Sequence, residues 1–468
     1  MFIDILFPRR HLLNNIQCQG EIPSTIELVR RTMTVAWPSI VETFLVSLVA
    51  FVDTIMVSGL GSYAIAAVGL TSQPKFITLI PFFSLNVALS AIVARRKGQK
   101  DRDSANRTLQ FSLLLSVVLV IVISALAFFF ADPLMRLAGT QEDTHEFATD
   151  YFRIIVAGMA FNVFSLVINA AQRGAGNTKI AMRTNLTSNA VNLFLNYLLI
   201  GGNWGFPMLG VRGAAIATVI GTVIAFFMSL ASILHRDGFL YLFYGKGSRY
   251  HIDKISLQSM WKVGSASLLE QAFLRIGFMT YAIIVAYLGT VAFAAHQVGM
   301  NIISISFALG NGLSIAAVTL VGQSLGEERP DLAKIFGRIC QRIGLMGSMT
   351  LALFFATLGR DIFRLFSHEE AILNYGDHIM KIIAVIVILQ IAQVIFSGCL
   401  RGAGDTKAVA LISLISVAII RPLAGWIFVY PLEMGLVGAW IGLLIDQFMR
   451  FILTLTRFGS GKWLKIKL

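Results

Sequence analysis

Twelve long apolar segments constrain the fold of this chain more than any other feature of its sequence. Each is about 20 residues long, the length that an α-helix needs to cross the ~30 Å hydrocarbon core of a bilayer. The segments begin near residues 33, 65, 109, 147, 181, 210, 260, 295, 335, 374, 406 and 435. Only 13% of the 468 residues are charged, against about 25% in soluble domains. The sequence therefore predicts an all-α polytopic membrane protein with twelve transmembrane helices.

Basic residues fall mainly on one side of the predicted membrane. If successive spans alternate in direction, 29 of the 38 Lys and Arg residues lie on the N-terminal side, six lie on the other side and three lie within spans. Basic loops stay in the cytoplasm, which predicts cytoplasmic termini and a cell (inner or plasma) membrane location. This asymmetry, together with contact to anionic membrane lipid, explains the net charge of +13 without a nucleic-acid partner.

The two halves of the chain resemble each other. The loop Arg-Gly-Ala-Gly-Asn-Thr-Lys that begins at Arg173 recurs as Arg-Gly-Ala-Gly-Asp-Thr-Lys from Arg401, and Gly61 matches Gly289 at the same offset of 228 residues. Collinear matches at one offset indicate a duplication. Because each half contains six spans, both enter the membrane in the same direction. The two bundles are therefore predicted to be parallel and related by a pseudo-twofold axis along the membrane normal.

These features predict five consecutive parts of the chain. They are a cytoplasmic N-terminal segment (1–32), a first six-helix bundle (33–235), a cytoplasmic linker (236–259), a second six-helix bundle (260–457) and a basic cytoplasmic tail (458–468).

Parallel six-helix halves favour a transporter that alternates access to a site between them. A membrane-embedded enzyme or a channel is the alternative from another class. The sequence has no GKS/T phosphate loop and no HExxH motif, so we expect neither an ATP-driven pump nor a metal enzyme. We also expect no cofactor other than a coupling ion.

Several motifs resemble those of the multidrug and toxic compound extrusion (MATE) family. They are the run Val52-Asp-Thr-Ile-Met-Val-Ser-Gly-Leu-Gly61, the paired Arg-Gly-Ala-Gly loops, Gly210-Val-Arg-Gly-Ala-Ala-Ile-Ala-Thr218 and Leu436-Val-Gly-Ala-Trp440. The resemblance implies a secondary antiporter, expected to work as a monomer, that exports small organic, mostly cationic, compounds in exchange for Na⁺ or H⁺. Export of a specific metabolite or a lipid-linked sugar is the alternative within transport.

Four acidic residues fall inside predicted spans: Glu42, Asp53, Glu270 and Asp446. Ionisable groups at bilayer depth cost about 2.5–3.5 kcal/mol each on insertion scales and usually mark functional sites. By resemblance, Asp53 and Glu270 bind the coupling ion or proton. Glu42 is the repeat equivalent of Glu270 and a candidate substrate or cavity residue. Asp446 is spaced four residues from Arg450, which predicts a local ion pair.

Neutral amides occupy positions at which some family members carry acids. Asn196 in the fifth span and Gln390 in the tenth are at such positions, and Asn192 and Gln393 lie about one turn away. An amide oxygen can coordinate a cation, but an amide neither takes up nor releases a proton at neutral pH. We therefore predict these four residues to line the cavity and leave proton exchange to the carboxylates.

Three further side chains have open alternatives. Asp53 either binds the coupling ion or is held by Asn and Thr side chains for helix packing. Arg421, which precedes Pro422 in the eleventh span, is a candidate cavity residue that is either part of a hinge or the partner of a carboxylate. Lys75 in the second span either reaches toward the membrane surface or faces the cavity.

Overall fold

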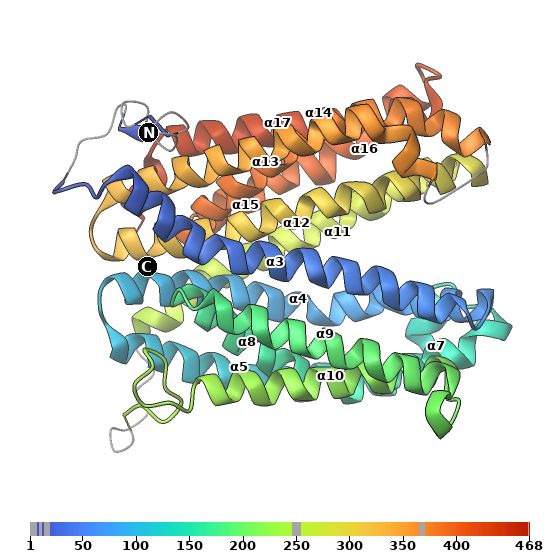
Figure 1. Ribbon diagram of the computed structural model, residues 1–468, viewed down its shortest axis with the longest axis horizontal. Helices are drawn as coiled ribbons and strands as arrows, with labels where there is room; N and C mark the ends of the chain where they lie inside the picture. Colours follow the sequence, from blue (N-terminus) through green and yellow to red (C-terminus); the bar gives the residue numbers. More distant parts are fainter. Residues whose placement is uncertain (1–6, 9–11, 14–18, 246–253, 365–369, 467) are drawn as a thin grey trace. The chain divides into compact units, whose positions relative to one another are not determined.

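The computed structural model describes residues 7–8, 12–13, 19–245, 254–364, 370–466 and 468. Within these residues the chain consists of helices and connecting loops, with no strand. Twelve long helical segments follow one another in the predicted order (Figure 1). In the first half these are α3 (Thr25–Ser58), α4 (Ser62–Gly98), α5 (Arg102–Phe129), the bent pair α7 (Glu142–Ala157) and α8 (Met159–Gly174), α9 (Thr178–Gly201) and α10 (Gly210–Ser232).

The second half has six corresponding segments. They are α11 (Lys254–Ala286), α12 (Thr290–Gly326), α13 (Pro330–Arg364), α14 (Glu370–Gly402), the run formed by α15 (Thr406–Ser413), η2 (Leu414–Ile420) and α16 (Arg421–Val429), and α17 (Gly435–Gly459). A short helix that the sequence did not predict, α6 (Ala131–Leu137), connects α5 to α7.

Most of these segments are long and apolar enough to cross a membrane. Ten pass this test within the described ranges, and the bent pair makes eleven. The remaining segment, α9, is more polar because Asn185, Asn189, Asn192 and Asn196 lie among its 24 residues. Many helices also exceed the predicted 20 residues: α12 has 37 residues and is therefore about 55 Å long.

The chain packs into two compact units. The first, here called the C-terminal unit, contains Met1–Thr43 and Trp261–Leu468, and the second, the N-terminal unit, contains Phe44–Met260. The boundaries fall inside α3 and inside α11. The division predicted from the repeat, at 33–235 and 260–457, stays a prediction about the domains.

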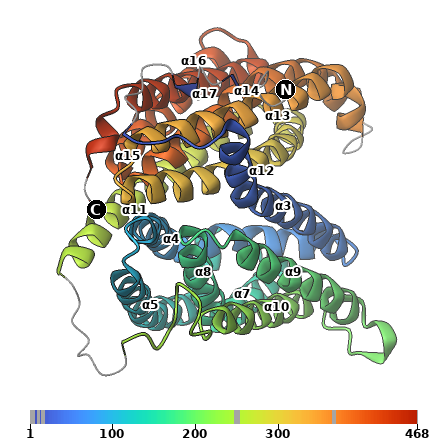
Figure 2. The same ribbon diagram turned by 60° about the vertical axis from the view of Figure 1, so that its left-hand side comes forward.

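In the N-terminal unit, α4 packs against α5, α7 and α8, and α10 packs against α7, α8 and α9. Figure 2 views these helices more nearly along their axes and shows their arrangement within the unit. The predicted linker (236–259) is described in part. Its residues Phe239 and Tyr241 exchange hydrogen bonds with Asn106 of α5, at 3.0 Å to the Phe239 carbonyl and 2.6 Å from the Tyr241 amide.

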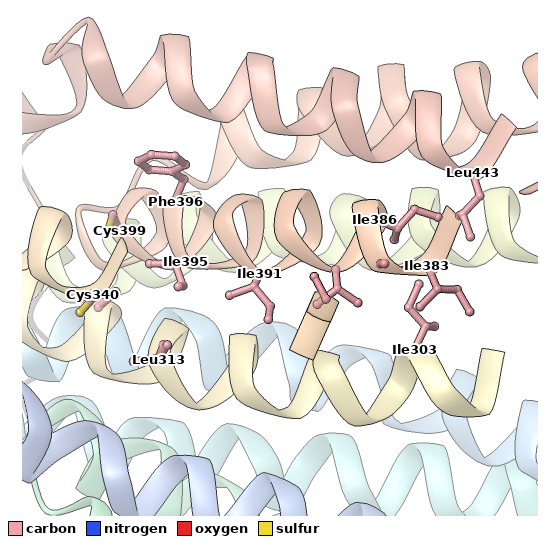
Figure 3. Close-up of a cluster of buried hydrophobic side chains, with 14 of the residues drawn as sticks. Ile303, Leu313, Cys340, Ile383, Ile386, Ile391, Ile395, Phe396, Cys399 and Leu443 are labelled. Atoms are coloured by element: carbon pink, nitrogen blue, oxygen red, sulfur yellow. The ribbon is translucent and has the colours of Figure 1, made fainter. Parts of the chain in front are cut away.

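In the C-terminal unit, α14 is the central helix and packs against α12, α13 and α17. Its apolar side chains Ile391 and Ile395 lie in a buried cluster with Leu313 of α12 (Figure 3). Cys340 and Cys399 belong to the same cluster as free, buried thiols.

The two halves differ at two places that matter for the sites described below. The fourth span of the first half bends by 51° between α7 and α8, at Gly158, whereas the equivalent α14 runs without a break. The eleventh span contains the π-helical segment η2 directly before Arg421, whereas the equivalent α9 is α-helical throughout. π-helical turns inside α-helices are often found at functional sites.

Candidate functional site

Asp53 is the centre of a polar cluster in the N-terminal unit. Asn196 Nδ2 donates a hydrogen bond of 2.9 Å to Asp53 Oδ1. The side-chain amide of Asn192 makes hydrogen bonds at both ends when its nitrogen is oriented toward Asp53. The nitrogen then donates to the two carboxylate oxygens, at 3.0 and 3.2 Å. The amide oxygen accepts from the hydroxyl and the backbone amide of Thr218, at 3.2 and 3.1 Å. Three helices, α3, α9 and α10, therefore meet around one carboxylate.

The spacing of the two asparagines explains how α9 presents them together. Residues four apart lie on the same face of an α-helix, so Asn192 and Asn196 both reach Asp53. Gly221 of α10 allows the close approach of α9, because a Cβ atom there would lie 2.9 Å from the Ser188 carbonyl oxygen and 3.3 Å from Asn192 Cβ. A larger residue would separate Thr218 from Asn192.

Lys75 and a small cavity lie beside this cluster. The cavity has a volume of about 30 Å³ and is lined by Lys75 and Thr78 of α4, by Gly158 and Asn162 at the bend, and by Thr218 and Thr222 of α10, with apolar neighbours. A space of ~10–15 Å³ by this kind of measure holds one water molecule. The site is therefore large enough for one or two waters but too small for an organic substrate.

Tyr151 of α7 closes the polar cluster. Its side chain is buried, and its hydroxyl is hydrogen-bonded to Thr218 and lies within the electrostatic range of Asp53. Thr218 therefore connects Tyr151, Asn192 and the cavity.

Gly158 keeps the bend between α7 and α8 closely packed, and we expect Gly158→Ala to lower the free energy of unfolding by about 1–3 kcal/mol through overpacking. A Cβ atom at residue 158 would lie 2.6 Å from both methyl groups of Val219, a side chain with restricted rotamers. Gly69→Ala on α4 is the matched control, since a Cβ there has no neighbour within 4 Å. Denaturant unfolding in detergent measures both, and equal stability of the two variants would contradict the overpacking.

Glu270 of the C-terminal unit lies in a different environment from Asp53. It is buried on α11 and forms an ion pair with Arg401 at the end of α14. Gln390 accepts a hydrogen bond from Ser306 at 3.4 Å, and Gln393 is buried one turn further along α14. Glu42 is also buried in this unit. No contact of these two glutamines with Glu270 is observed among the described residues.

Arg421 binds Asp446, which resolves one alternative left open by the sequence. The Nε and Nη2 atoms of Arg421 lie 3.0 and 2.6 Å from Asp446 Oδ2. Arg450 adds the predicted local ion pair to the same carboxylate at 3.2 Å. The side chains of Arg421 and Asp446 are 3% and 0% exposed, so this charge cluster is fully enclosed by the unit.

Aromatic rings surround the Arg421 guanidinium. The guanidinium carbon lies 4.7 Å from the Phe278 ring centroid and 5.8 Å from that of Tyr281. Such stacking adds a cation–π attraction to the ion pair. The hydroxyl of Tyr281 donates to the Ala439 carbonyl at 2.8 Å, which connects α11 to α17 beside the charges.

The structure thus groups the predicted site residues into separate sets within the two units. Asp53, Asn192 and Asn196 form one cluster, Glu270 pairs with Arg401, and Arg421 joins Asp446 and Arg450. Sequence reasoning missed Tyr151 and Thr218. Thr218 ends a motif that was recognised only as a family resemblance, and Tyr151 carried no signal.

Comparison with known proteins now decides the family. A family model described as MatE matches residues 38–198 and 266–427 of the chain. The chain belongs to the MATE family. It is therefore a membrane transporter and not an enzyme, as the sequence predicted.

Curated relatives of this MATE protein match along nearly the whole chain. The "Probable multidrug resistance protein NorM" of Thermotoga maritima is 28% identical over 468 residues, covering 98% of this chain and 97% of the relative. The "Multidrug resistance protein MdtK" of Edwardsiella ictaluri is 26% identical over 440 residues, covering 93% of this chain and 95% of the relative.

Solved MATE structures share the fold. One, described as the outward-facing conformation of a multidrug resistance MATE family transporter, matches with a TM-score of 0.85 and 24% identity and covers 95% of this chain and all of that chain. A MOP superfamily transporter from Pyrococcus furiosus matches with the same score and identity over 96% of this chain and all of that chain. The predicted fold class, an all-α polytopic protein of the two-bundle MATE type, is confirmed.

Proposed function

We propose that this MATE protein is a secondary active antiporter that exports organic, mostly cationic, compounds in exchange for inward H⁺ or Na⁺ by alternating access. The observation that carries the proposal is the half-buried Asp53 carboxylate, held by Asn192 and Asn196 next to Lys75 and a small cavity. A carboxylate in such a place can exchange a small cation, while the cavity excludes an organic molecule. Coupling and substrate binding therefore use different surfaces.

The comparisons support the exporting role. Relatives that match nearly the whole chain are named multidrug resistance proteins. Solved structures of the same fold are described in straight and bent conformations. We extend the exporting role of the named relatives to this chain.

Other residues receive roles in the same proposal. Glu270 is a second coupling residue whose ion pair with Arg401 opens when it takes up a proton or cation. Glu42, Gln390, Gln393 and Arg421 contribute to the lining or support of the substrate path. We further propose that the protein acts as a monomer in the cell membrane, with cytoplasmic termini and basic loops against anionic lipid.

Efflux of a fluorescent organic cation from proteoliposomes tests the function. Purified protein is reconstituted, loaded with dye, and given either an H⁺ or a Na⁺ gradient at fixed membrane potential. We expect one of the two gradients to drive efflux well above that of protein-free liposomes, and Glu270→Gln to reduce it. Absence of driven efflux for every tested cation would overturn the multidrug function.

A further inference from the structure

Lys75 and Asn196 each present a hydrogen-bonding group without a partner in the N-terminal unit. The Lys75 ammonium, which lines the cavity, forms no hydrogen bond or ion pair with any residue that the structure describes. The side-chain oxygen of Asn196 is buried and likewise has no donor among those residues. Asn196 itself is 2% exposed, so bulk water does not compensate that oxygen. The N-terminal unit therefore holds an unpaired donor, which lines the cavity, and an unpaired acceptor on a residue that contacts Asp53.

Geometry connects the two groups through Asp53. Asn196 donates to Asp53 through its nitrogen, which leaves its oxygen beside the carboxylate. Lys75 shares the cavity wall with Thr218, whose hydroxyl contacts Asn192, and Asn192 contacts Asp53. The charge of Lys75 acts electrostatically on Asp53. The ammonium is thus held near Asp53 without being locked to it.

The charges facing Asp53 from every neighbouring helix are few. Helix α4 contributes Lys75 and α7 contributes the neutral phenol of Tyr151. Among the residues that the structure describes, α9 and α10 contribute the neutral side chains of Asn192, Asn196 and Thr218. Among these groups one carboxylate is balanced by one ammonium. A second cation would leave the half-buried site with an excess positive charge, which is costly where the dielectric constant is low.

The equivalent position in the other half of the repeat also lies beside a basic side chain. At the repeat offset of 228 residues, Asp53 corresponds to Tyr281, and Tyr281 lies against the Arg421 guanidinium. That guanidinium is fixed by Asp446. Both halves thus place a basic side chain at their polar centre, but the arginine is bound tightly and the lysine is not.

We propose that Lys75 is the resident counter-ion of Asp53 and thereby excludes Na⁺ from this site, so that the transporter is coupled to protons. When Asp53 takes up a proton, it loses its charge and the ammonium moves away from it toward the cavity. When Asp53 releases the proton, the ammonium returns and uses the free Asn196 oxygen as a second acceptor. Lys75 is a positioning residue that determines ion selectivity, and its role rests on the antiport function proposed above.

Substituting Lys75 tests this role in the dye-efflux assay. For the wild-type protein we expect efflux under an H⁺ gradient and no response to a Na⁺ gradient. Lys75→Gln and Lys75→Met remove the resident charge. For both variants we expect a Na⁺ gradient to drive efflux at initial rates about tenfold above the undriven background rate of wild type, the change that ~1.4 kcal/mol produces. Lys75→Arg keeps the charge and is expected to remain insensitive to Na⁺. The matched control is Lys97→Gln, on the same helix but 22 residues away, about 33 Å along its axis.

A binding measurement decides the inference separately from transport. Melting temperatures in detergent are compared in NaCl and in KCl at equal ionic strength, across a pH series. We expect Na⁺ to stabilise Lys75→Gln and Lys75→Met but neither wild type nor Lys97→Gln. Na⁺-driven efflux by wild type, Na⁺ stabilisation of wild type, or Na⁺ insensitivity of both neutral variants would overturn it. If wild type transports no cation under any gradient, the antiport function fails, and the melting series still tests Na⁺ exclusion by Lys75.

Discussion

Replacing Asp53 with asparagine is expected to reduce gradient-driven efflux to the level of protein-free liposomes. The substitution keeps the size of the side chain, and one oxygen remains to accept from Asn196, which donates at 2.9 Å to the carboxylate. It removes the negative charge and the ability to bind a proton. Without them, neither an imposed H⁺ gradient nor an imposed Na⁺ gradient has a group on which to act in this unit.

The variant should remain folded, although less stable. Asn192 and Asn196 both direct nitrogen donors at residue 53, so the new NH₂ group of the asparagine meets donors. An unsatisfied buried polar group costs about 1–3 kcal/mol. We expect a lower melting temperature together with a normal elution volume in size-exclusion chromatography.

A matched control separates coupling from general effects of an Asp→Asn change. Asp103 lies in the same unit and pairs with Arg107 on an exposed helix face, with side-chain exposures of 48% and 40%. Asp103→Asn is expected to keep wild-type efflux, because exposed ion pairs contribute ~0–1 kcal/mol. Wild-type efflux by Asp53→Asn would remove Asp53 as the coupling residue and leave the helix-packing interpretation.

The fold was largely predictable because membrane spans leave a strong local signal. Each span must satisfy its backbone hydrogen bonds within the helix and present apolar side chains to lipid, and both requirements can be read over 20 residues. Helix ends were less predictable: α3 begins at Thr25 and α11 at Lys254, several residues before the apolar stretches. The polar first turns of these helices lie outside the apolar stretches, so hydropathy does not show where the helices begin.

The Asp53 cluster was predictable only in part. Asn192 and Asn196 share a helix face, so their common direction follows from the sequence, and an acidic residue within a span attracts attention. Tyr151 and Thr218 reach the cluster from α7 and α10, and no local pattern indicates which helices pack together. The partner of Glu270 was missed for the same reason, since Arg401 lies 131 residues away.

The duplicated halves have diverged in how their polar centres treat charge. In the N-terminal unit, neutral amides surround one carboxylate, and no described residue fixes the nearby lysine by a hydrogen bond or ion pair. In the C-terminal unit, Arg421 and Arg450 saturate Asp446. A centre whose charges are permanently paired has nothing to exchange. The Asp446 centre is therefore expected to be a rigid support, and the mobile charges of the transport cycle are expected at Asp53 and at the proposed second coupling residue, Glu270.

Asp446→Asn is accordingly expected to destabilise the protein more than any other single change considered above. Asp446 is 0% exposed and lies between Arg421, at 2.6 Å, and Arg450, at 3.2 Å. Removing its charge leaves two guanidinium groups without a counter-ion in the interior of the unit. Loss of one partner of a buried ion pair costs about 3–5 kcal/mol, a large share of the ~5–15 kcal/mol that stabilises a typical protein.

Unfolding measurements in detergent check this expectation against two comparisons. Asp377→Asn is the matched control. Asp377 lies 3.6 Å from Arg360, and the side chains of the two residues are 35% and 46% exposed. We expect this variant to lose less than ~1 kcal/mol of unfolding free energy. The double variant Arg421→Met with Asp446→Asn should be less destabilised than the sum of the two single changes, since the second substitution removes a charge that the first left unpaired. Additive losses would show that Arg421 and Asp446 do not stabilise each other, and the C-terminal centre would then be as free to exchange charge as the one around Asp53.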